Sequence, residues 1–112
     1  MPKRGPAVLV RIYTEEGTRD GDGPLYEAIV MKARQLGLAG ATVLRGPMGF
    51  GRSQRVHTAK ILDLSANLPL VIEIVDAEEK IEALLAALGD MRDIGLVTTE
   101  KVQVVHCKGD AD

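Results

Sequence analysis

Alternating apolar positions predict two long β-strands. In residues 8–13, Val8, Val10 and Ile12 share one face, because successive side chains of a strand point to opposite sides of the sheet. The strongest pattern covers residues 68–75, where every second position from Leu70 is leucine or isoleucine. Further strands are expected at residues 41–44, 60–64 and 102–107, the middle one being short.

A first amphipathic helix is predicted between the first two strands. Residues 24–36 place apolar side chains on one helical face. Pro24 suits the first helical position, and Gly37 suits a left-handed residue just beyond the end. The preceding residues 14–22 are rich in glycine and acids and are expected to form a loop.

A second amphipathic helix is predicted after the strongest strand. Asp76 and Glu79 have the spacing of a capping box, so Asp76 is the expected N-cap of a helix over residues 77–88. Gly89 is expected to end it. The next segment, GDMRDIGLVTTEK, is interpreted as a connection to the last strand.

The predicted order is β-α-β-β-α-β, the α+β, ferredoxin-like arrangement of an antiparallel sheet with two helices on one face. We expect one domain in residues 1–112, with an ordered core over about residues 7–107. The other sheet face would carry a large apolar area that is rarely left in water, so we expect self-association in a closed ring. The side chains expected on that face are Leu9, Arg11, Tyr13, Val71, Glu73, Val75, Gln103, Val105 and Cys107.

Residues 45–60, RGPMGFGRSQRVHTAK, carry a concentrated positive charge that stands out in an acidic chain. The segment has four cationic side chains and no acid, whereas the whole chain has a net charge of −2. Glycines let backbone N–H groups approach a ligand closely, and such groups with arginines favour an anion, above all a phosphate. The predicted phosphate ligands are Arg45, Arg52 and Arg55, with backbone N–H groups of Gly46, Gly49 and Gly51, while Phe50 could pack on a base or anchor the loop.

Composition excludes several other classes of function. The chain has three aromatic residues and no tryptophan, which disfavours nucleic-acid binding by base stacking, and its net acidity disfavours binding to duplexes. Cys107 is the only cysteine, which favours a reducing, cytoplasmic location. The sequence contains no apolar run long enough for a membrane span, and Arg11 interrupts the N-terminal apolar run, which disfavours a signal peptide.

His57 is the only histidine near the basic segment. A catalytic role would need a nucleophile or water beside it and an orienting carboxylate; Ser53 and Thr58 are the nearest hydroxyls in sequence. A polar or nucleotide contact is the favoured interpretation, and a small enzyme acting on a phosphorylated metabolite is the alternative. His106 and Cys107 would point to opposite faces of a strand, which disfavours metal binding.

Acidic side chains have simpler interpretations. Glu73 is interpreted as a sheet-face carboxylate that pairs with Arg11 across the oligomer, rather than as a site acid with a raised pKa. A second group of acids is interpreted as a solvated loop: Glu15, Glu16, Asp20 and Asp22.

Several blocks of sequence resemble one bacterial family. PLYEAIVMKARQLGLAGATVLRGPMGFG, HTAKILDLSANLPLVIEIVDAEEKIEALL and GLVTTEKVQVV are similar, in order and spacing, to the family named domain of unknown function 190. The resemblance runs from about Val8 to Val105. The family is grouped with the PII-like signalling proteins, which implies a ferredoxin-like fold and a homotrimer.

The basic segment also resembles a run found in true PII proteins, Arg-Gly-Phe-Gly-Arg-Gln. Here Arg45-Gly46 and then Gly49-Phe50-Gly51-Arg52 are followed by Gln54. The likeness implies that ATP or ADP binds in clefts between subunits, with the arginine on phosphate and the glutamine near Mg²⁺ and 2-oxoglutarate.

The chain departs from true PII proteins in ways that predict a different ligand or partner. Pro47 and Met48 interrupt the run, Ser53 displaces Gln54, and residues 46–75 contain no tyrosine. GLVTTEK replaces the Gly-Asp-Gly-Lys run before the last strand, so Lys101 could substitute for its lysine, and Thr98 and Thr99 could close the cleft.

The sequence therefore predicts a cytoplasmic, homotrimeric PII-like sensor of an anionic small molecule, which switches a partner interaction through the basic segment. The expected effector is ATP, ADP, AMP or a cyclic nucleotide; no covalent cofactor or metal is expected, and a need for Mg²⁺ is left open. The family's gene neighbourhood beside fluoride channels implies a membrane transporter or channel as partner, and a ligand-free scaffold is a further alternative. The predicted ligand-binding residues are Arg45, Gly46, Gly49, Phe50, Gly51, Arg52, Gln54, Arg55, His57, Thr98, Thr99 and Lys101.

Overall fold

The computed structural model describes residues 4–51, 54–58, 67–89 and 94–108, and the strand expected at residues 60–64 lies outside them. Two helices and four longer strands follow one another in the predicted order. Two pairs of very short strands lie between them. The elements are β1 (Gly5–Glu15), β2 (Arg19–Asp20), β3 (Gly23–Pro24), α1 (Leu25–Gln35), β4 (Thr42–Arg45), β5 (Met48–Gly49), β6 (His57–Thr58), β7 (Pro69–Asp76), α2 (Glu78–Leu88) and β8 (Leu96–Val104).

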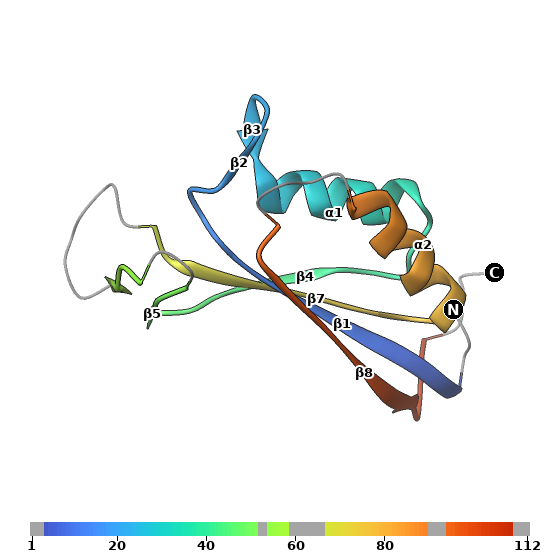
Figure 1. Cartoon of the computed structure of the whole chain (residues 1–112). Coiled ribbons are helices and arrows are strands. Elements are labelled where there is room, and N and C mark those ends of the chain that lie inside the picture. The colour runs from blue at the N-terminus through green and yellow to red at the C-terminus, as the bar shows by residue number, and fades with distance from the viewer. Residues whose placement is uncertain (1–3, 52–53, 59–66, 90–93, 109–112) are drawn as a thin grey trace.

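The main sheet has the strand order β4-β7-β1-β8, and each neighbouring pair is antiparallel. Both helices cover the same face of this sheet (Figure 1). Two small antiparallel ribbons, β2-β3 and β5-β6, extend from it. This arrangement confirms the predicted α+β, ferredoxin-like fold.

The core lies between the helices and the sheet, and it follows the predicted alternation. The even-numbered residues in the middle of β1 and throughout β7 meet the apolar faces of α1 and α2 and are buried. Burying a branched aliphatic side chain contributes about 1.5–3 kcal/mol, so this set supplies most of the driving force for folding. The core cluster contains Val10, Ile12, Leu25, Ile29, Ala33, Ile72, Ile74, Ile81, Leu84 and Leu88.

Helix α1 ends in the left-handed turn that the sequence predicts. Gly37 has φ +78°, and its N–H donates to the carbonyl of Arg34 at 3.1 Å. The N–H of Leu38 donates to the carbonyl of Ala33 at 3.0 Å, which completes a Schellman motif. Pro24 is the N-cap rather than the first helical residue, a shift of one position. No helix formed by the described residues is long and apolar enough to cross a membrane.

Asp76 has a different role from the predicted N-cap of α2. The N-cap is Ala77, and Asp76 is the last residue of β7 with no exposed surface. Its carboxylate accepts the N–H of Ala39 at 2.9 Å and the N–H of Ala77 at 2.7 Å. Asp76 continues the inward-facing, even-numbered positions of β7, and burial makes these backbone donors its partners. It therefore links the segment after α1 to the start of α2.

The last strand begins six residues earlier than predicted. β8 spans Leu96–Val104, so the segment expected to be a connection forms most of the strand. It pairs with β1 along its whole length, from Leu96 opposite Tyr13 to Val104 opposite Gly5. The run LVTTEKV does not alternate between apolar and polar residues, and pairing with a neighbouring strand overrides the missing pattern.

This register also changes the composition of the face that the helices leave uncovered, which we call the open face. Paired side chains of antiparallel strands lie on the same side, and a shift by one residue reverses the side. Gln103 was predicted to lie on the open face, but this register places it on the helix-covered side. Val105 and Cys107, also predicted there, follow the end of β8. The contribution of β8 to the open face is Leu96, Thr98, Glu100, Val102 and Val104.

A glycine at the start of β8 makes this pairing geometrically possible. Gly95 has φ +88°, and a Cβ placed on it would collide with the carbonyl oxygen of Tyr13. We expect Gly95→Ala to lower the free energy of unfolding by about 2 kcal/mol or more, through both steric overlap and backbone strain. Gly40→Ala is a matched control, because no atom lies within 4 Å of a Cβ there. Urea denaturation measures both variants, and equal stability would contradict the proposed close approach.

Candidate functional site

The basic segment leaves and rejoins the sheet at the same end. β4 ends at Arg45, and its neighbour β7 starts at Pro69, so the outgoing and returning chains lie close together. Between them, β5 and β6 pair Gly49 with His57 in a short ribbon that projects beyond the sheet (Figure 1). Of the predicted ligand residues in this segment, Arg52 lies outside the described residues.

Glu16 connects the first residue of the basic segment with the chain that returns to β7. One carboxylate oxygen forms an ion pair with Nη2 of Arg45 at 3.0 Å, and the other accepts the N–H of Leu68 at 3.2 Å. The backbone N–H of Glu16 also donates to the carbonyl of Leu68 at 2.9 Å. The Arg45 side chain remains 64% exposed, so solvent screens this pair considerably.

Glu15 makes the matching contact with His57 on β6. Its Oε2 lies 3.0 Å from Nε2 of His57, and the His57 side chain is only 13% exposed. Its Oε1 accepts a long hydrogen bond, 3.5 Å, from the side-chain amide of Asn67, whose carbonyl oxygen accepts the N–H of Gly17. The interpretation of Glu15 and Glu16 as a solvated loop is therefore wrong: they contact Arg45 and His57 of the basic segment.

Two of the three glycines predicted to offer N–H groups to a ligand pack against Pro69 in this structure. The N–H of Gly46 donates to the carbonyl of Pro69 at 2.8 Å. A Cβ on either Gly46 or Gly49 would lie 3.1 Å from Cγ of Pro69, so both glycines let the segment lie on the proline ring. Gly51 has no such neighbour, and its carbonyl accepts the N–H of Gln54 at 2.9 Å.

Apolar side chains are prominent on the projecting ribbon. Met48 and Phe50 are each 63% exposed, and Val56 is 52% exposed. Phe50 therefore does not anchor the segment to the core of its own chain. Arg55 is also exposed and lies between Val56 and Gln54, whose φ of +64° places it in a left-handed turn.

The predicted ligand residues of β8 lie along the sheet, away from the end that carries the basic segment. Thr98 faces the open face opposite Arg11, and Lys101 lies opposite Val8 on the helix-covered side. Val8 is seven residues from Glu15, which corresponds to roughly 23 Å along a strand. The structure thus places Arg45 and His57 beside the successive residues Glu16 and Glu15, and it separates Lys101 from them. Thr99, opposite Val10, is also directed to the helix-covered side.

The open face carries a charged triad that the sequence only partly anticipates. Arg11 donates from Nε to Glu73 at 3.1 Å and from Nη1 to Glu100 at 2.9 Å. The hydrogen bond to Glu73, then that to Glu100, raises the pKa of Arg11. Arg11 and Glu73 are opposite each other within one chain, so their pairing does not require the oligomer as predicted. Glu100 was missed because its face depends on the register of β8.

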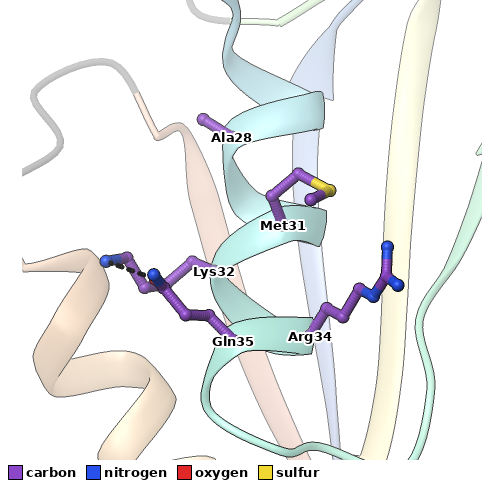
Figure 2. Close-up of a pocket in the computed structure, with 5 residues that line it drawn as sticks. All are labelled: Ala28, Met31, Lys32, Arg34 and Gln35. Carbon is purple, nitrogen blue, oxygen red and sulfur yellow. Dashed lines mark hydrogen bonds between the residues drawn. The ribbon is translucent and has the colours of Figure 1, made fainter.

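A separate surface pocket of about 400 Å³ lies on the outer side of α1. It is lined by Ala28, Met31, Lys32, Arg34 and Gln35, none of which the sequence predicts to bind a ligand. Lys32 and Arg34 leave the helix in opposite directions, and Lys32 donates to Gln35 at 3.3 Å (Figure 2). The two cations are therefore not directed toward a common point, and this pocket is not the predicted anion site.

Solved structures show which form of the ferredoxin-like fold the chain adopts. A provisionally assigned PII-like signaling protein from Thermus thermophilus superposes with a TM-score of 0.66 at 20% identity, covering 93% of this chain and 94% of that one. CPII, a nitrogen regulatory PII-like protein from Thiomonas intermedia, was solved with ADP and bicarbonate; it gives a TM-score of 0.65 at 20% identity, with 91% of each chain covered. The chain therefore has the PII-like form of the ferredoxin-like fold.

Sequence relatives place the chain within one family. The family described as Uncharacterized ACR (DUF190) matches residues 7–104. A UPF0166 protein of Aquifex aeolicus is 37% identical over 98 residues, covering 88% of this chain and 92% of its own. A UPF0166 protein of Methanocaldococcus jannaschii is 36% identical over 92 residues, covering 81% and 84%. The chain belongs to the DUF190 family, which confirms the resemblance found in its sequence.

Packing against Pro69 gives the glycines of the basic segment unequal roles. We expect Gly46→Ala to lower the free energy of unfolding by about 1 kcal/mol, because its Cβ would press on the proline ring. Gly51→Ala is the matched control, since a Cβ there meets no atom within 4 Å and is expected to leave stability unchanged. Chemical denaturation compares the two, and equal losses would contradict the packing role of Gly46.

Proposed function

We propose that this protein is a cytoplasmic, homotrimeric PII-like signalling protein that binds an adenine nucleotide in clefts between subunits. The observation that carries the proposal is the placement of the basic segment at one end of a PII-like sheet, with Arg45 and His57 at its base. The basic segment would switch contact with a partner, for which a membrane transporter or channel is the candidate.

Self-association is supported by the composition of the open face. Its apolar side chains include Tyr13, Leu44 and Leu96, which are 39%, 48% and 62% exposed in the single chain. A contiguous apolar area of this kind is usually covered in the functional state. Arg11 is already paired with Glu73 and Glu100 within the chain, which lowers the cost of covering its charge.

An anionic effector is supported by both chemistry and likeness. Arg45, Arg55 and His57 lie on a short segment that carries no acid of its own. CPII, which shares the fold, was solved with ADP, AMP and bicarbonate. Identity to CPII is 19–20%, so this likeness shows a shared fold. Binding of an adenine nucleotide by this chain is the proposal that calorimetry tests.

A trimer is the first expectation to test. Light scattering at micromolar concentration should give three times the 12.0 kDa mass of one chain. Tyr13→Lys, which adds a charge to the open face, should shift the protein toward monomer because an unpaired cation would be buried. Met31→Lys on the outer side of α1 is the control, since Met31 is also exposed, at 55%. A monomeric wild-type protein would contradict the assembly and the inter-subunit site.

Nucleotide binding is measurable by calorimetry with ATP, ADP, AMP and cyclic AMP, each with and without Mg²⁺ and bicarbonate. We expect at least one to bind, and Arg55→Gln to weaken that binding roughly tenfold through loss of a charge-assisted hydrogen bond. Arg34→Gln in the separate α1 pocket removes the same charge and should leave affinity unchanged. Absence of binding by any nucleotide up to millimolar concentration would rule out the nucleotide proposal.

A further inference from the structure

We infer that Glu15 and Glu16 form an internal clamp that holds the basic segment in a resting position and competes with the anionic effector. The clamp consists of these two carboxylates with Arg45, His57 and the returning residues Asn67–Leu68. This inference rests on the proposed function for the identity of the competing anion. The holding role stands on the contacts of the chain itself.

The clamp joins two points of the basic segment to the chain that returns to β7. Glu16 bonds the first residue, Arg45, and the returning residue, Leu68, through its two carboxylate oxygens. Glu15 uses one oxygen for His57 on β6 and the other for Asn67. Because both glutamates stand at the end of β1, Arg45 and His57 are held beside the main sheet.

Competition follows from the chemistry of the donors. The Nη2 of Arg45 and the Nε2 of His57 each lie 3.0 Å from a carboxylate oxygen. A phosphate oxygen could take the place of each carboxylate oxygen at a similar distance. An anion that takes these donors must displace the carboxylates or leave two negative groups side by side, which is unfavourable. Effector binding would therefore release the segment from Glu15 and Glu16.

Limited proteolysis tests the holding role without a ligand. Phe50 is the only aromatic residue in the segment, so chymotrypsin cleavage there yields fragments 1–50 and 51–112. Glu15→Gln with Glu16→Gln keeps the size of each side chain and one acceptor oxygen but removes both charges, and we expect cleavage roughly three- to tenfold faster than in the wild type. Asp20→Asn with Asp22→Asn removes the same charge from the exposed β2-β3 ribbon and should leave the rate unchanged.

A charge exchange separates the clamp from a general loss of stability. Glu16→Arg places two cations together and should accelerate cleavage at Phe50, and adding Arg45→Glu should restore the slow rate. Thermal unfolding of each variant checks that it is folded. A rate in the double glutamine variant equal to the control, or no restoration by the exchange, would overturn the holding role whether or not a nucleotide binds.

ADP is the probe for competition. By calorimetry, the double glutamine variant should bind ADP roughly three- to tenfold more tightly than the wild type, while the Asp20→Asn, Asp22→Asn control should match the wild type. Equal or weaker binding in the double glutamine variant would overturn the competition. If ADP binds none of the proteins, competition falls with the proposed function, and the cleavage rates still decide whether the clamp exists.

Discussion

Pairing of β1 on both edges is the constraint on which the rest of the structure depends. β1 lies between β7 and β8, and its registers with them fix which side of each strand faces the helices. Its even-numbered residues, such as Val10 and Ile12, lie in the core. Its odd-numbered residues line the open face, and Glu15 and Glu16 stand where the strand ends. One strand thus supplies the core, the surface proposed for assembly and the carboxylates beside the basic segment.

Much of this fold could be predicted because local pattern and tertiary pairing agree. The alternation of apolar residues in β1 and β7 predicts a strand with one buried face, and Gly37 predicts the left-handed turn that ends α1. β8 could not be located in the same way, since LVTTEKV has no alternation and only the partner strand decides its register. Asp76 shows a second limit: an N-cap and a buried acceptor of backbone N–H groups have the same local sequence, and burial alone distinguishes them.

The candidate site shows why charge counted along a sequence is an incomplete guide to electrostatics. Residues 45–60 carry no acid, which predicts a field of uncompensated positive charge. The fold brings Glu16 to Arg45 and Glu15 to His57, and the pairing is invisible to any local window because the partners are 29 and 42 residues apart. The glycines are similar, since Pro69 lies 23 residues after Gly46 and 20 after Gly49. A signal that could have found these contacts was present only in the predicted antiparallel topology, which brings the ends of β1 and β4 to the start of β7.

Assembly and the basic segment are connected through the geometry of β1. Glu15 shares the open side of the strand with Arg11 and Tyr13, because successive residues alternate between faces. Glu15 therefore stands at the rim of the surface that the proposed trimer would cover, and its partner His57 lies beside it. A neighbouring subunit placed on Tyr13 would approach the same carboxylate that holds the segment. In such a trimer, an anion that displaced Glu15 would act at the boundary between subunits. The exchange of partners at His57 would then change the contacts of both the basic segment and the neighbouring subunit.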